Sequence, residues 1–493
     1  MNLARIVGPH PAKALALVQG HRRVSYGQLR AQVARSRAGL VANGVGPDDR
    51  VGLLCPSSPE FVVAYLAVLG VGAVAVPLNP QSPLEELSQQ LSAVRPVALV
   101  VGPAEEGAGE SLVGRELVVL PAVDLPASTG PNAGMVDRLA DEPAALLFTS
   151  GTAGFPKAAV LTHGSLLANI EQMGLRVGTA ATSDDVALLL IPPFHIFGLN
   201  AVLGVQLFVG GVTVLAQRFD PASTFELVQS EKATILPGVP ELFAALAGHL
   251  EANGDELATI RLAVSGAAPL ASEVAARFHE RFGIRLWQGY GLTEASPAVT
   301  FPDLTGHYDP RSVGMPLPGV EVRVVDSDGN AVLAGDPGEI LLRGPNVFAG
   351  YFEDTAATER VLDAAGWLHT GDVAVMSDEG ELTIVDRRKD LIIVSGFNVF
   401  PAEVEQVLAR HPGVVEAAVI GVPNPPHGES VRAFVVPQAS LWPESSEVPG
   451  LSEPELVLYC ARHLARYKCP ARVSFVRALP RSMHGKALRR QLH

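Results

Sequence analysis

Hydroxyl, glycine and lysine side chains gather in residues 148–158, FTSGTAGFPKA, directly after the apolar run Ala144–Leu147. Glycines let successive backbone N–H groups face one anion, hydroxyls add hydrogen-bond donors, and a lysine adds a positive charge. This combination suits a polyphosphate. It is not the Walker pattern, because Pro156 stands where that pattern requires glycine, so a Ras-like or kinase-like nucleotide hydrolase is disfavoured. Taken alone, the segment is equally compatible with an ordinary strand-to-helix loop.

Six other segments place small, polar or charged residues where they could contact a nucleotide or an acid. They are PPFHIFG at 192–198, SGAAPL at 265–270, QGYGLTEA at 288–295, WLHTGD at 367–372, DRRKDLIIVSGFNVFPAEVE at 386–405 and LPRSMHGKALRR at 479–490. Each has a simpler structural interpretation when it is taken singly. A lone histidine in an apolar stretch is usually a core residue, and a threonine at a helix start is usually a cap. A charged run is usually a solvated turn, and a lysine near the C-terminus is usually exposed.

Together, and in this order, the seven segments resemble the motifs of the adenylate-forming superfamily, which includes acyl-CoA synthetases, firefly luciferase and peptide-synthetase adenylation domains. The first segment resembles the signature YTSGTTGxPKG. The resemblance covers roughly residues 25–490, and it is strong because several independent motifs coincide in order. Two positions depart from the signature: Ala153 replaces a usual threonine, and Ala158 replaces a usual glycine. Loss of the threonine removes a phosphate hydrogen bond worth about 1.5–3 kcal/mol, so full catalytic speed is left open.

The resemblance implies roles for residues in the first 300 positions. The mobile loop that covers the β- and γ-phosphates of ATP would comprise Thr149, Ser150, Gly151, Thr152, Gly154 and Lys157. The AMP moiety would be contacted by Gly266, Ala267, Tyr290, Gly291 and Thr293, with Tyr290 stacked on adenine and Thr293 bonded to the α-phosphate. Glu294 would hold Mg²⁺, a hard cation that prefers carboxylate oxygen. The acyl pocket would include His195, Gly266 and Gly291, with His195 near the substrate carboxylate; whether it acts as a base is open.

The later segments imply a second group of roles. Asp372 would accept the ribose hydroxyls, since a carboxylate offers acceptors only. Arg387 would reach the ribose or a phosphate, and Lys389 would be the hinge between two domains. Ser395 and Gly396 would line the tunnel for the pantetheine of CoA. Lys486 would bridge the substrate carboxylate and the α-phosphate during adenylation. Nine Lys or Arg and no acidic residue follow Ala461, which fits a basic lid that faces phosphates.

The resemblance therefore implies an ATP-dependent carboxylic acid:CoA ligase that forms acyl-AMP and then acyl-CoA, with Mg²⁺ as cofactor and ATP and CoA as co-substrates. Glycines and an apolar helix after Gly198 favour a medium- or long-chain fatty acid, although the segment PPFHIFGLN resembles 4-coumarate ligases equally well. Three alternatives remain: an acyl-adenylate synthetase that loads a carrier protein, a luciferase-like oxidation, and a non-catalytic nucleotide or acyl binder.

The elements that must position these residues follow from the apolar pattern. Ser25 and Gln28 have capping-box spacing, and helical patterns then alternate with short apolar strands through much of the first 300 residues. This alternation predicts an α/β fold of βαβ sheets with helices, and residues 103–140 are expected to be irregular. We expect an N-terminal adenylation domain at 1–388, with a small β-barrel-like subdomain at about 315–388. A mobile α+β C-terminal lid domain is expected at 389–493.

Composition narrows the partners and the compartment. The net charge of −14 argues against nucleic acid, which requires a basic surface. Three separated cysteines form no CxxC pair, which fits a reducing compartment and hence the cytoplasm. We expect no signal peptide, and the two long uncharged runs, Phe61–Leu78 and Ile196–Ala216, are interrupted by glycines, so a helix followed by a buried strand explains them better than a membrane span. Peripheral membrane contact, and a monomer or a homodimer, both remain compatible with the sequence.

Overall fold

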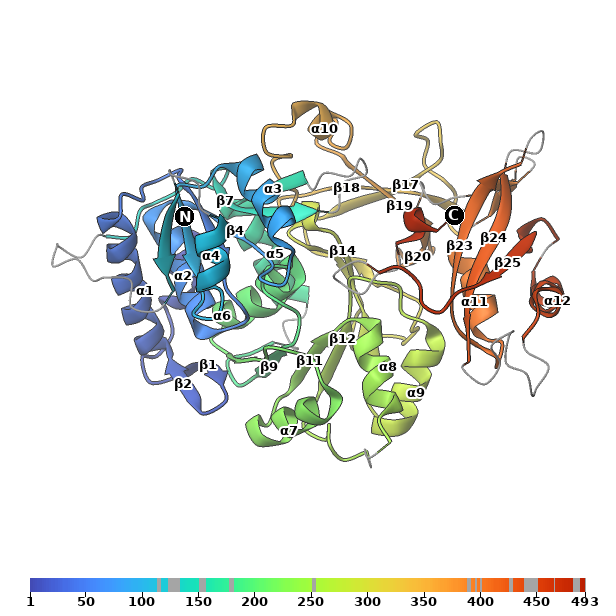
Figure 1. The fold of residues 1–493 in the computed structure, drawn as a ribbon, viewed down its shortest axis with the longest axis horizontal. Helices are drawn as coiled ribbons and strands as arrows, with labels where there is room; N and C mark the ends of the chain where they lie inside the picture. Colours follow the sequence, from blue (N-terminus) through green and yellow to red (C-terminus); the bar gives the residue numbers. More distant parts are fainter. Residues whose placement is uncertain are drawn as a thin grey trace. The chain divides into compact units, whose positions relative to one another are not determined.

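The computed structural model divides the chain into two compact units. The first comprises residues 1–322 and 342–368, and the second comprises residues 323–341 and 369–493. Each unit is described by itself (Figure 1). The structure describes residues 1–112, 117–122, 134–149, 157–176, 181–250, 254–387, 392–394, 397–399, 401–424, 429–438, 451–464, 466–481 and 488–492.

A six-stranded sheet in the first unit presents the glycine-rich segment. Its strands, in spatial order, are β6 (Val118–Pro121), β5 (Ala98–Val101), β3 (Arg50–Leu54), β4 (Val74–Pro77), β7 (Pro143–Thr149) and β8 (Lys157–Thr162). All neighbours are parallel except β7 and β8, which pair antiparallel. Because β7 ends at Thr149 and β8 begins at Lys157, the segment between them connects two adjacent strands of the same sheet.

A seven-stranded sheet forms the other half of the first unit. Its strands, in spatial order, are β13 (Leu286–Gln288), β12 (Leu262–Ser265), β11 (Ile235–Gly238), β9 (Val186–Leu189), β10 (Val212–Leu215), β1 (Leu15–Gln19) and β2 (Arg22–Ser25). Only the β1–β2 pair is antiparallel. The motifs SGAAPL and QGYGLTEA begin at the ends of β12 and β13, so the parallel order of these strands brings both motifs to the same edge of the sheet.

Helices cover both sheets, as the alternating pattern predicts. They are α1 (Tyr26–Ala42), α2 (Pro59–Val71), α3 (Leu84–Val94), α4 (Glu106–Leu112), α5 (His163–Arg176), α6 (Val205–Val209), α7 (Pro221–Glu231), α8 (Pro240–Gly248), α9 (Ser272–Phe282) and α10 (Thr355–Glu359). A π-helix spans Phe197–Gly204 and leads into α6. The predicted capping box of α1 is present, with the Ser25 hydroxyl accepting from the Gln28 N–H. Residues 103–140 were expected to be irregular, but they include α4 and β6.

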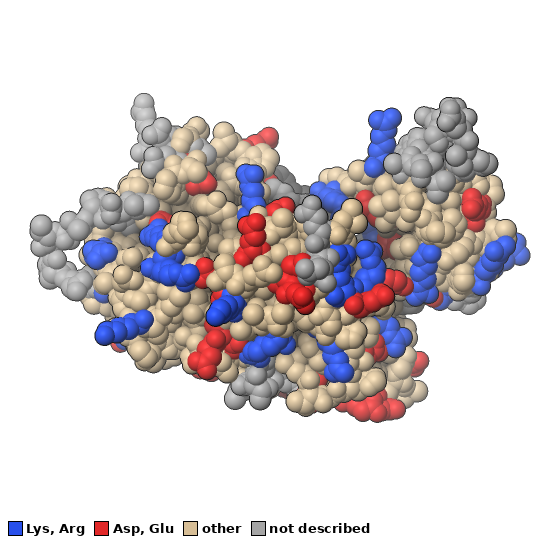
Figure 2. All heavy atoms as spheres, turned by 90° about the horizontal axis from the view of Figure 1, so that it is seen from below, with Lys and Arg blue, Asp and Glu red and all other residues tan. Residues whose placement is uncertain are grey.

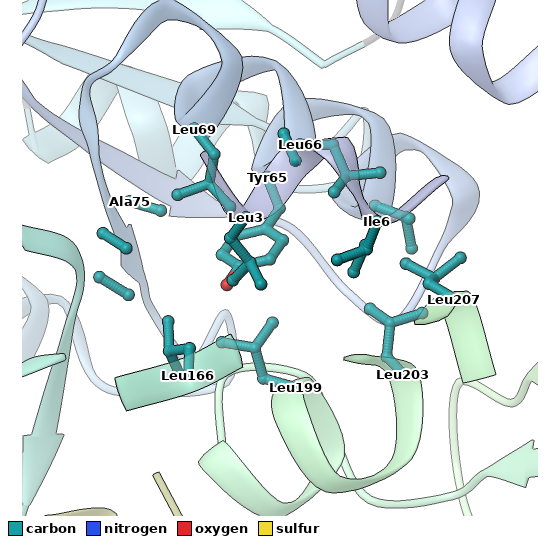
Figure 3. Close-up of a cluster of buried hydrophobic side chains, with 14 of the residues drawn as sticks. Leu3, Ile6, Tyr65, Leu66, Leu69, Ala75, Leu166, Leu199, Leu203 and Leu207 are labelled. Atoms are coloured by element: carbon teal, nitrogen blue, oxygen red, sulfur yellow. The ribbon is translucent and has the colours of Figure 1, made fainter. Parts of the chain in front are cut away.

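The core follows the two-residue period of the strands. On β9, for example, Leu188 packs with α7, α8 and α9, whereas Leu189 belongs to a central cluster. That central cluster joins both sheets with α2, α5 and the π-helix. Figure 3 shows Leu66 of α2, Leu166 of α5 and Leu199 of the π-helix directed into this cluster. Full burial of such a side chain contributes about 1.5–3 kcal/mol, so the cluster strongly favours one arrangement of the two sheets.

The two long uncharged runs are each a helix followed by a strand. The first comprises α2 and β4, and the second comprises the π-helix, α6 and β10, with Gly210 in a left-handed conformation between them. Within the described ranges, no helix has both the length and the apolar character needed to cross a bilayer. Figure 2 shows one face of the molecule, on which Lys and Arg side chains are interspersed with Asp and Glu over the described part.

From about residue 290 onward, the strands pair mainly in antiparallel fashion. The strands β14 (Tyr290–Gly291), β15 (Ala298–Phe301) and β16 (Met315–Pro316) form a small antiparallel sheet in the first unit. The strands β17 (Glu321–Val325), β18 (Pro337–Arg343), β19 (Leu368–Met376) and β20 (Leu382–Arg387) form a four-stranded sheet, most of whose residues belong to the second unit. The left-handed Gly329 follows Asp328 in the connection between β17 and β18.

The rest of the second unit is an α+β domain, as predicted. It contains β21 (Ile392–Val394), β22 (Phe397–Val399), α11 (Pro401–Ala409), β23 (Val414–Pro423), β24 (Glu429–Pro437), α12 (Glu453–His463) and β25 (Arg472–Phe475). The sheet order β23-β24-β25 places both helices against a core that includes Leu408, Val435 and Leu456. The Ser452 hydroxyl caps α12 by accepting from the Glu455 N–H.

Candidate active site

The β7–β8 hairpin fixes the two ends of the glycine-rich segment. Thr149 and Lys157 are paired residues of the antiparallel ladder, and the Thr149 hydroxyl lies 3.5 Å from the Lys157 carbonyl oxygen. The predicted hydroxyl and lysine at the segment's ends therefore lie directly opposite each other. The predicted phosphate-loop residues Ser150, Gly151, Thr152 and Gly154 lie outside the described residues.

Glu294 stands in a short 3-10 helix, Thr293–Ala295, between β14 and β15. Its backbone is held by the loop that follows β18, because its carbonyl accepts from the Phe348 N–H at 2.9 Å. Buried Asn346 of the same loop donates from Nδ2 to the carbonyl of Ala295 at 3.0 Å. The half-buried Glu294 side chain is held as well, since the Tyr351 hydroxyl donates to Glu294 Oε1 at 2.7 Å.

Tyr351 also connects Glu294 to the β7–β8 hairpin. The Lys157 ammonium lies over the Tyr351 ring, with Nζ 5.0 Å from the ring centroid. Burial, and secondarily the charge of Glu294, raise the pKa of Tyr351 far above its usual value, so the phenol keeps its proton and donates. The Lys157 cation, the ring and hydroxyl of Tyr351 and the Glu294 carboxylate thus follow one another in space.

Glu294 suits a divalent cation that is shared with phosphates. Among the described residues, its Oε1 accepts from Tyr351 and its other carboxylate oxygen accepts no hydrogen bond. The described ranges contain no cluster of three or more His, Cys, Asp or Glu that could form an all-protein metal cage. Mg²⁺ is usually bound through one or two carboxylates together with substrate phosphates, and one open carboxylate oxygen fits that mode.

His195 precedes the π-helix, and its ring is oriented by the backbone. Its Nδ1 accepts from the Phe197 N–H at 3.2 Å. Because Nδ1 is an acceptor, a neutral imidazole carries its proton on Nε2. In this arrangement Nε2 can donate a hydrogen bond to a carboxylate. The ring orientation is compatible with a donor role for His195, and that role stays a prediction.

Gly266 and Ala267 follow β12 and lie against the same segment. A Cβ added to buried Gly266 would be 3.0 Å from Cε1 of Phe197, so the Phe197 ring covers the Gly266 backbone. Exposed Ala267 has a left-handed backbone, with φ of 67°. The SGAAPL turn is therefore shaped partly by Phe197, a residue that the sequence analysis did not identify although it lies two positions after His195.

Tyr290 and Gly291 form β14, whose partner is β15. Tyr290 pairs with Thr300 and Gly291 pairs with Ala298, on either side of an irregularity in the ladder. A Cβ at Gly291 would be only 2.3 Å from the Pro297 carbonyl oxygen. This glycine is therefore required by the close approach of two backbone segments, in addition to any role in a pocket. Thr293 and Glu294 begin directly after that contact.

Asp372 belongs to the second unit. It is 6% exposed and lies on β19 opposite Arg387 of β20. Its N–H donates to the Thr370 hydroxyl at 3.0 Å, and that hydroxyl donates to the Ile340 carbonyl at 2.8 Å. The Asp372 backbone is therefore fixed by its own strand and by β18.

Several predicted residues cannot be placed. The Arg387 backbone is part of β20, but its side chain lies outside the described atoms. Lys389, Ser395, Gly396 and Lys486 also lie outside the described residues. The structure thus brings Lys157 and Glu294 together through Tyr351, and it places Asp372 in the second unit.

Tyr351 and Asn346 were missed because their partners are distant in sequence. Tyr351 contacts a carboxylate 57 positions earlier. The available signal was the segment GPNVFAGYF at 344–352, which carries two glycines and a tyrosine. Without the pairing partner, that pattern is also typical of an ordinary turn.

Comparison with known proteins identifies relatives along nearly the whole chain. Residues 3–352 match the model of the AMP-binding enzyme family, and residues 403–486 match that of the AMP-binding enzyme C-terminal domain. A feruloyl-CoA synthase from Amycolatopsis is 37% identical over 485 residues, covering 98% of this chain and 95% of the relative. A long-chain-fatty-acid–CoA ligase from Escherichia coli O157:H7 is 34% identical over 503 residues, covering 93% of this chain and 88% of the relative.

Solved structures agree with this result. The ATP-bound MatB of Rhodopseudomonas palustris superimposes with a TM-score of 0.91 at 33% identity, covering 100% of this chain and 98% of that one. The o-succinylbenzoate CoA synthetase of Bacillus subtilis, in complex with its acyl-adenylate intermediate, gives a TM-score of 0.87 at 30% identity, covering 100% of this chain and 97% of that one.

The close approach at Gly291 yields a test of the local geometry. We expect Gly291→Ala to displace the Thr293–Ala295 helix, because the new methyl would collide with the Pro297 carbonyl. Overpacking of this kind costs about 1–3 kcal/mol. Thermal unfolding and ATP binding should both be impaired, whereas Gly134→Ala, at a position with open space around the added Cβ, should leave both unchanged. Equal behaviour of the two variants would contradict the packing described for β14.

Proposed function

This chain belongs to the family of AMP-binding enzymes, and we propose that as an ATP-dependent acyl-CoA ligase it activates a medium- or long-chain fatty acid. The observation that carries the assignment of the site is the connection from Lys157 through Tyr351 to Glu294. The lysine of the glycine-rich segment and an open carboxylate oxygen both lie next to one tyrosine, which supports a site for a polyphosphate and its cation.

In the proposed reaction, a substrate carboxylate oxygen attacks the α-phosphorus of ATP. The bond from that phosphorus to the bridging oxygen breaks, pyrophosphate leaves, and acyl-AMP forms. The CoA thiolate then attacks the acyl carbon, the bond from that carbon to the anhydride oxygen breaks, and AMP leaves with this oxygen, which came from the substrate carboxylate. Catalysis of the first step is mainly positioning and charge stabilisation. Mg²⁺ held by Glu294 would neutralise charge on the phosphate oxygens.

The remaining side chains are assigned to binding and orientation. His195 donates from Nε2 to the substrate carboxylate, consistent with the orientation of its ring. The glycine-rich segment holds the β- and γ-phosphates, Tyr290 stacks on adenine, and Thr293 bonds to the α-phosphate. Asp372 accepts the ribose hydroxyls, and Arg387 reaches the ribose or a phosphate. These assignments follow the matching motifs of the family.

The second half-reaction requires a change of the small domain. We assign 1–388 to the adenylation domain and 389–493 to the lid, with Lys389 as the hinge. Lys389 lies in the stretch between the two family matches, which end at 352 and begin at 403. Ser395 and Gly396 would line the pantetheine tunnel of the second conformation, whereas Lys486 would act only in the first. The cytoplasm suits the three free cysteines.

Two lysine variants should separate the half-reactions. Lys486→Ala should lower acid-dependent ATP–pyrophosphate exchange by roughly 10²–10³-fold, because an ammonium that stabilises developing phosphate charge is lost. Lys389→Pro should leave that exchange unchanged and slow thioester formation, because proline restricts the backbone rotation at the hinge. Exchange at the wild-type rate in Lys486→Ala would contradict its assigned role. An equal loss of both half-reactions in Lys389→Pro would contradict the hinge.

A hydroxycinnamate is the second candidate substrate. The feruloyl-CoA synthase relative supports it, as does the Phe197 ring that lies against Gly266 and offers a flat apolar surface. The fatty-acid proposal is supported by the long-chain ligase relative and by the apolar, largely buried π-helix that follows His195.

A panel of acids decides between them and also tests the acceptor. We expect kcat/KM, measured as loss of the free CoA thiol, to rise from butyrate to dodecanoate and to exceed that for ferulate and benzoate, because each buried methylene contributes about 0.8 kcal/mol. A higher value for ferulate would replace the fatty-acid proposal. Adenylation without thiol loss, for every acid in the panel, would favour a carrier-protein acceptor instead of CoA.

A further inference from the structure

We propose that Tyr351 is a positioning residue that orients the Glu294 carboxylate for the magnesium ion of MgATP and keeps Lys157 from pairing with that carboxylate. The proposal rests on the function proposed above and extends it to a residue outside the recognised motifs. Its basis is the 2.7 Å hydrogen bond from Tyr351 to Glu294 Oε1 and the position of Lys157 Nζ, 5.0 Å from the centroid of the same ring.

The Tyr351 side chain starts from a fixed backbone. Its N–H donates to the Thr358 hydroxyl at 2.9 Å, and that hydroxyl in turn donates to the Asp354 carbonyl at 2.9 Å. Tyr351 also forms a β-bridge with Ala159 of β8. The Phe348 ring meets its ring edge-on, with centroids 5.1 Å apart. These contacts, made on different sides, define the direction in which the phenol points.

The loop after β18 is hydrogen-bonded to the β7–β8 hairpin on both sides of Tyr351. The Val160 N–H donates to the Gly350 carbonyl at 2.9 Å, and the Phe352 N–H donates to the Ala158 carbonyl at 2.8 Å. These bonds attach the loop to the first residues of β8, directly after Lys157. A displacement of Lys157 and β8 would therefore be transmitted to Tyr351 and, through its hydroxyl, to Glu294.

The hydrogen bond divides the two carboxylate oxygens of Glu294 between different tasks. Oε1 is engaged by Tyr351, which leaves the second oxygen as the free acceptor among the described groups. A cation would then be bound through a single oxygen in a defined direction. Groups that orient metal ligands in this way typically contribute 10–100-fold to metal affinity.

The aromatic ring also separates two opposite charges. A lysine near a carboxylate would ordinarily form an ion pair and would compete with a bound cation for it. Here neither Lys157 nor Glu294 has an ion-pair partner among the described residues, and the ammonium instead faces the ring of Tyr351. The arrangement leaves Lys157 available to phosphate oxygens and leaves Glu294 available to the metal.

The test compares metal binding with nucleotide binding in the full-length Tyr351→Phe variant. ATP binding is measured by calorimetry in EDTA, without any acid so that no reaction occurs. Mn²⁺ binding to the enzyme–ATP complex is measured by electron paramagnetic resonance. We expect the Kd of Mn²⁺ to rise 10–100-fold and the Kd of metal-free ATP to stay unchanged. In turnover, the apparent KM for Mg²⁺ should rise, and excess Mg²⁺ should restore kcat.

Tyr308→Phe is the matched control. The Tyr308 phenol donates to a backbone carbonyl, that of Leu286, at 3.1 Å, so its loss should change neither constant. If Tyr351→Phe does not fold, Thr358→Val tests the same point, because it removes the acceptor of the Tyr351 N–H. The Kd of Mn²⁺ should then rise in Thr358→Val. Unchanged Mn²⁺ affinity in the tested variant would overturn the proposal. An equal weakening of Mn²⁺ and metal-free ATP would also overturn it, since it would indicate a merely structural role.

The outcome is separable from that of the proposed function. A wild-type enzyme that binds MnATP but catalyses no acid-dependent exchange would refute the ligase activity, while the effect of Tyr351→Phe on Mn²⁺ affinity would still decide the role of Tyr351. A wild-type enzyme that binds no ATP would refute both.

Discussion

A carboxylate that is to bind magnesium has to keep one oxygen open and avoid capture by the lysine that binds the same phosphates. Glu294 meets these conditions through its hydrogen bond with Tyr351, whose ring in turn faces Lys157. The bond is possible because the loop after β18 is attached to β8 by backbone hydrogen bonds on both sides of Tyr351. The contact between Tyr351 and Glu294 thus depends on the pairing of segments almost 200 residues apart in sequence.

The two large sheets serve this arrangement differently. The six-stranded sheet ends in the β7–β8 hairpin and presents the glycine-rich segment, whereas the seven-stranded sheet leads through β13 into the strand and helix that carry Tyr290 and Glu294. Both sheets contribute to one apolar cluster with α2, α5 and the π-helix (Figure 3). The packing of that cluster therefore determines how closely Lys157 and Glu294 can approach.

Local sequence patterns predicted many of the helices and strands, but they could not predict contacts between residues that are distant in sequence. The α1 capping box is set by neighbouring residues, and the alternation of helices with short apolar strands is set by the local pattern, so the sequence indicated both correctly. Helix α4 and strand β6 lie in a stretch rich in Gly, Ala and Pro, whose local pattern predicts neither element. They form because tertiary packing stabilises them. Glu294 was found through its motif, but its partner Tyr351 was not, because long-range pairing of the loop after β18 with β8 brings that tyrosine to it.

The most direct test of the central claim follows the oxygen atoms of the substrate. A carboxylic acid labelled with ¹⁸O at both oxygens is converted with MgATP and CoA, and the products are analysed by mass spectrometry. Attack on the α-phosphorus predicts one ¹⁸O in the released AMP, one in the acyl-CoA and none in pyrophosphate. Unlabelled AMP, or ¹⁸O in pyrophosphate or inorganic phosphate, would show that the acid does not pass through an acyl-adenylate and would contradict the account.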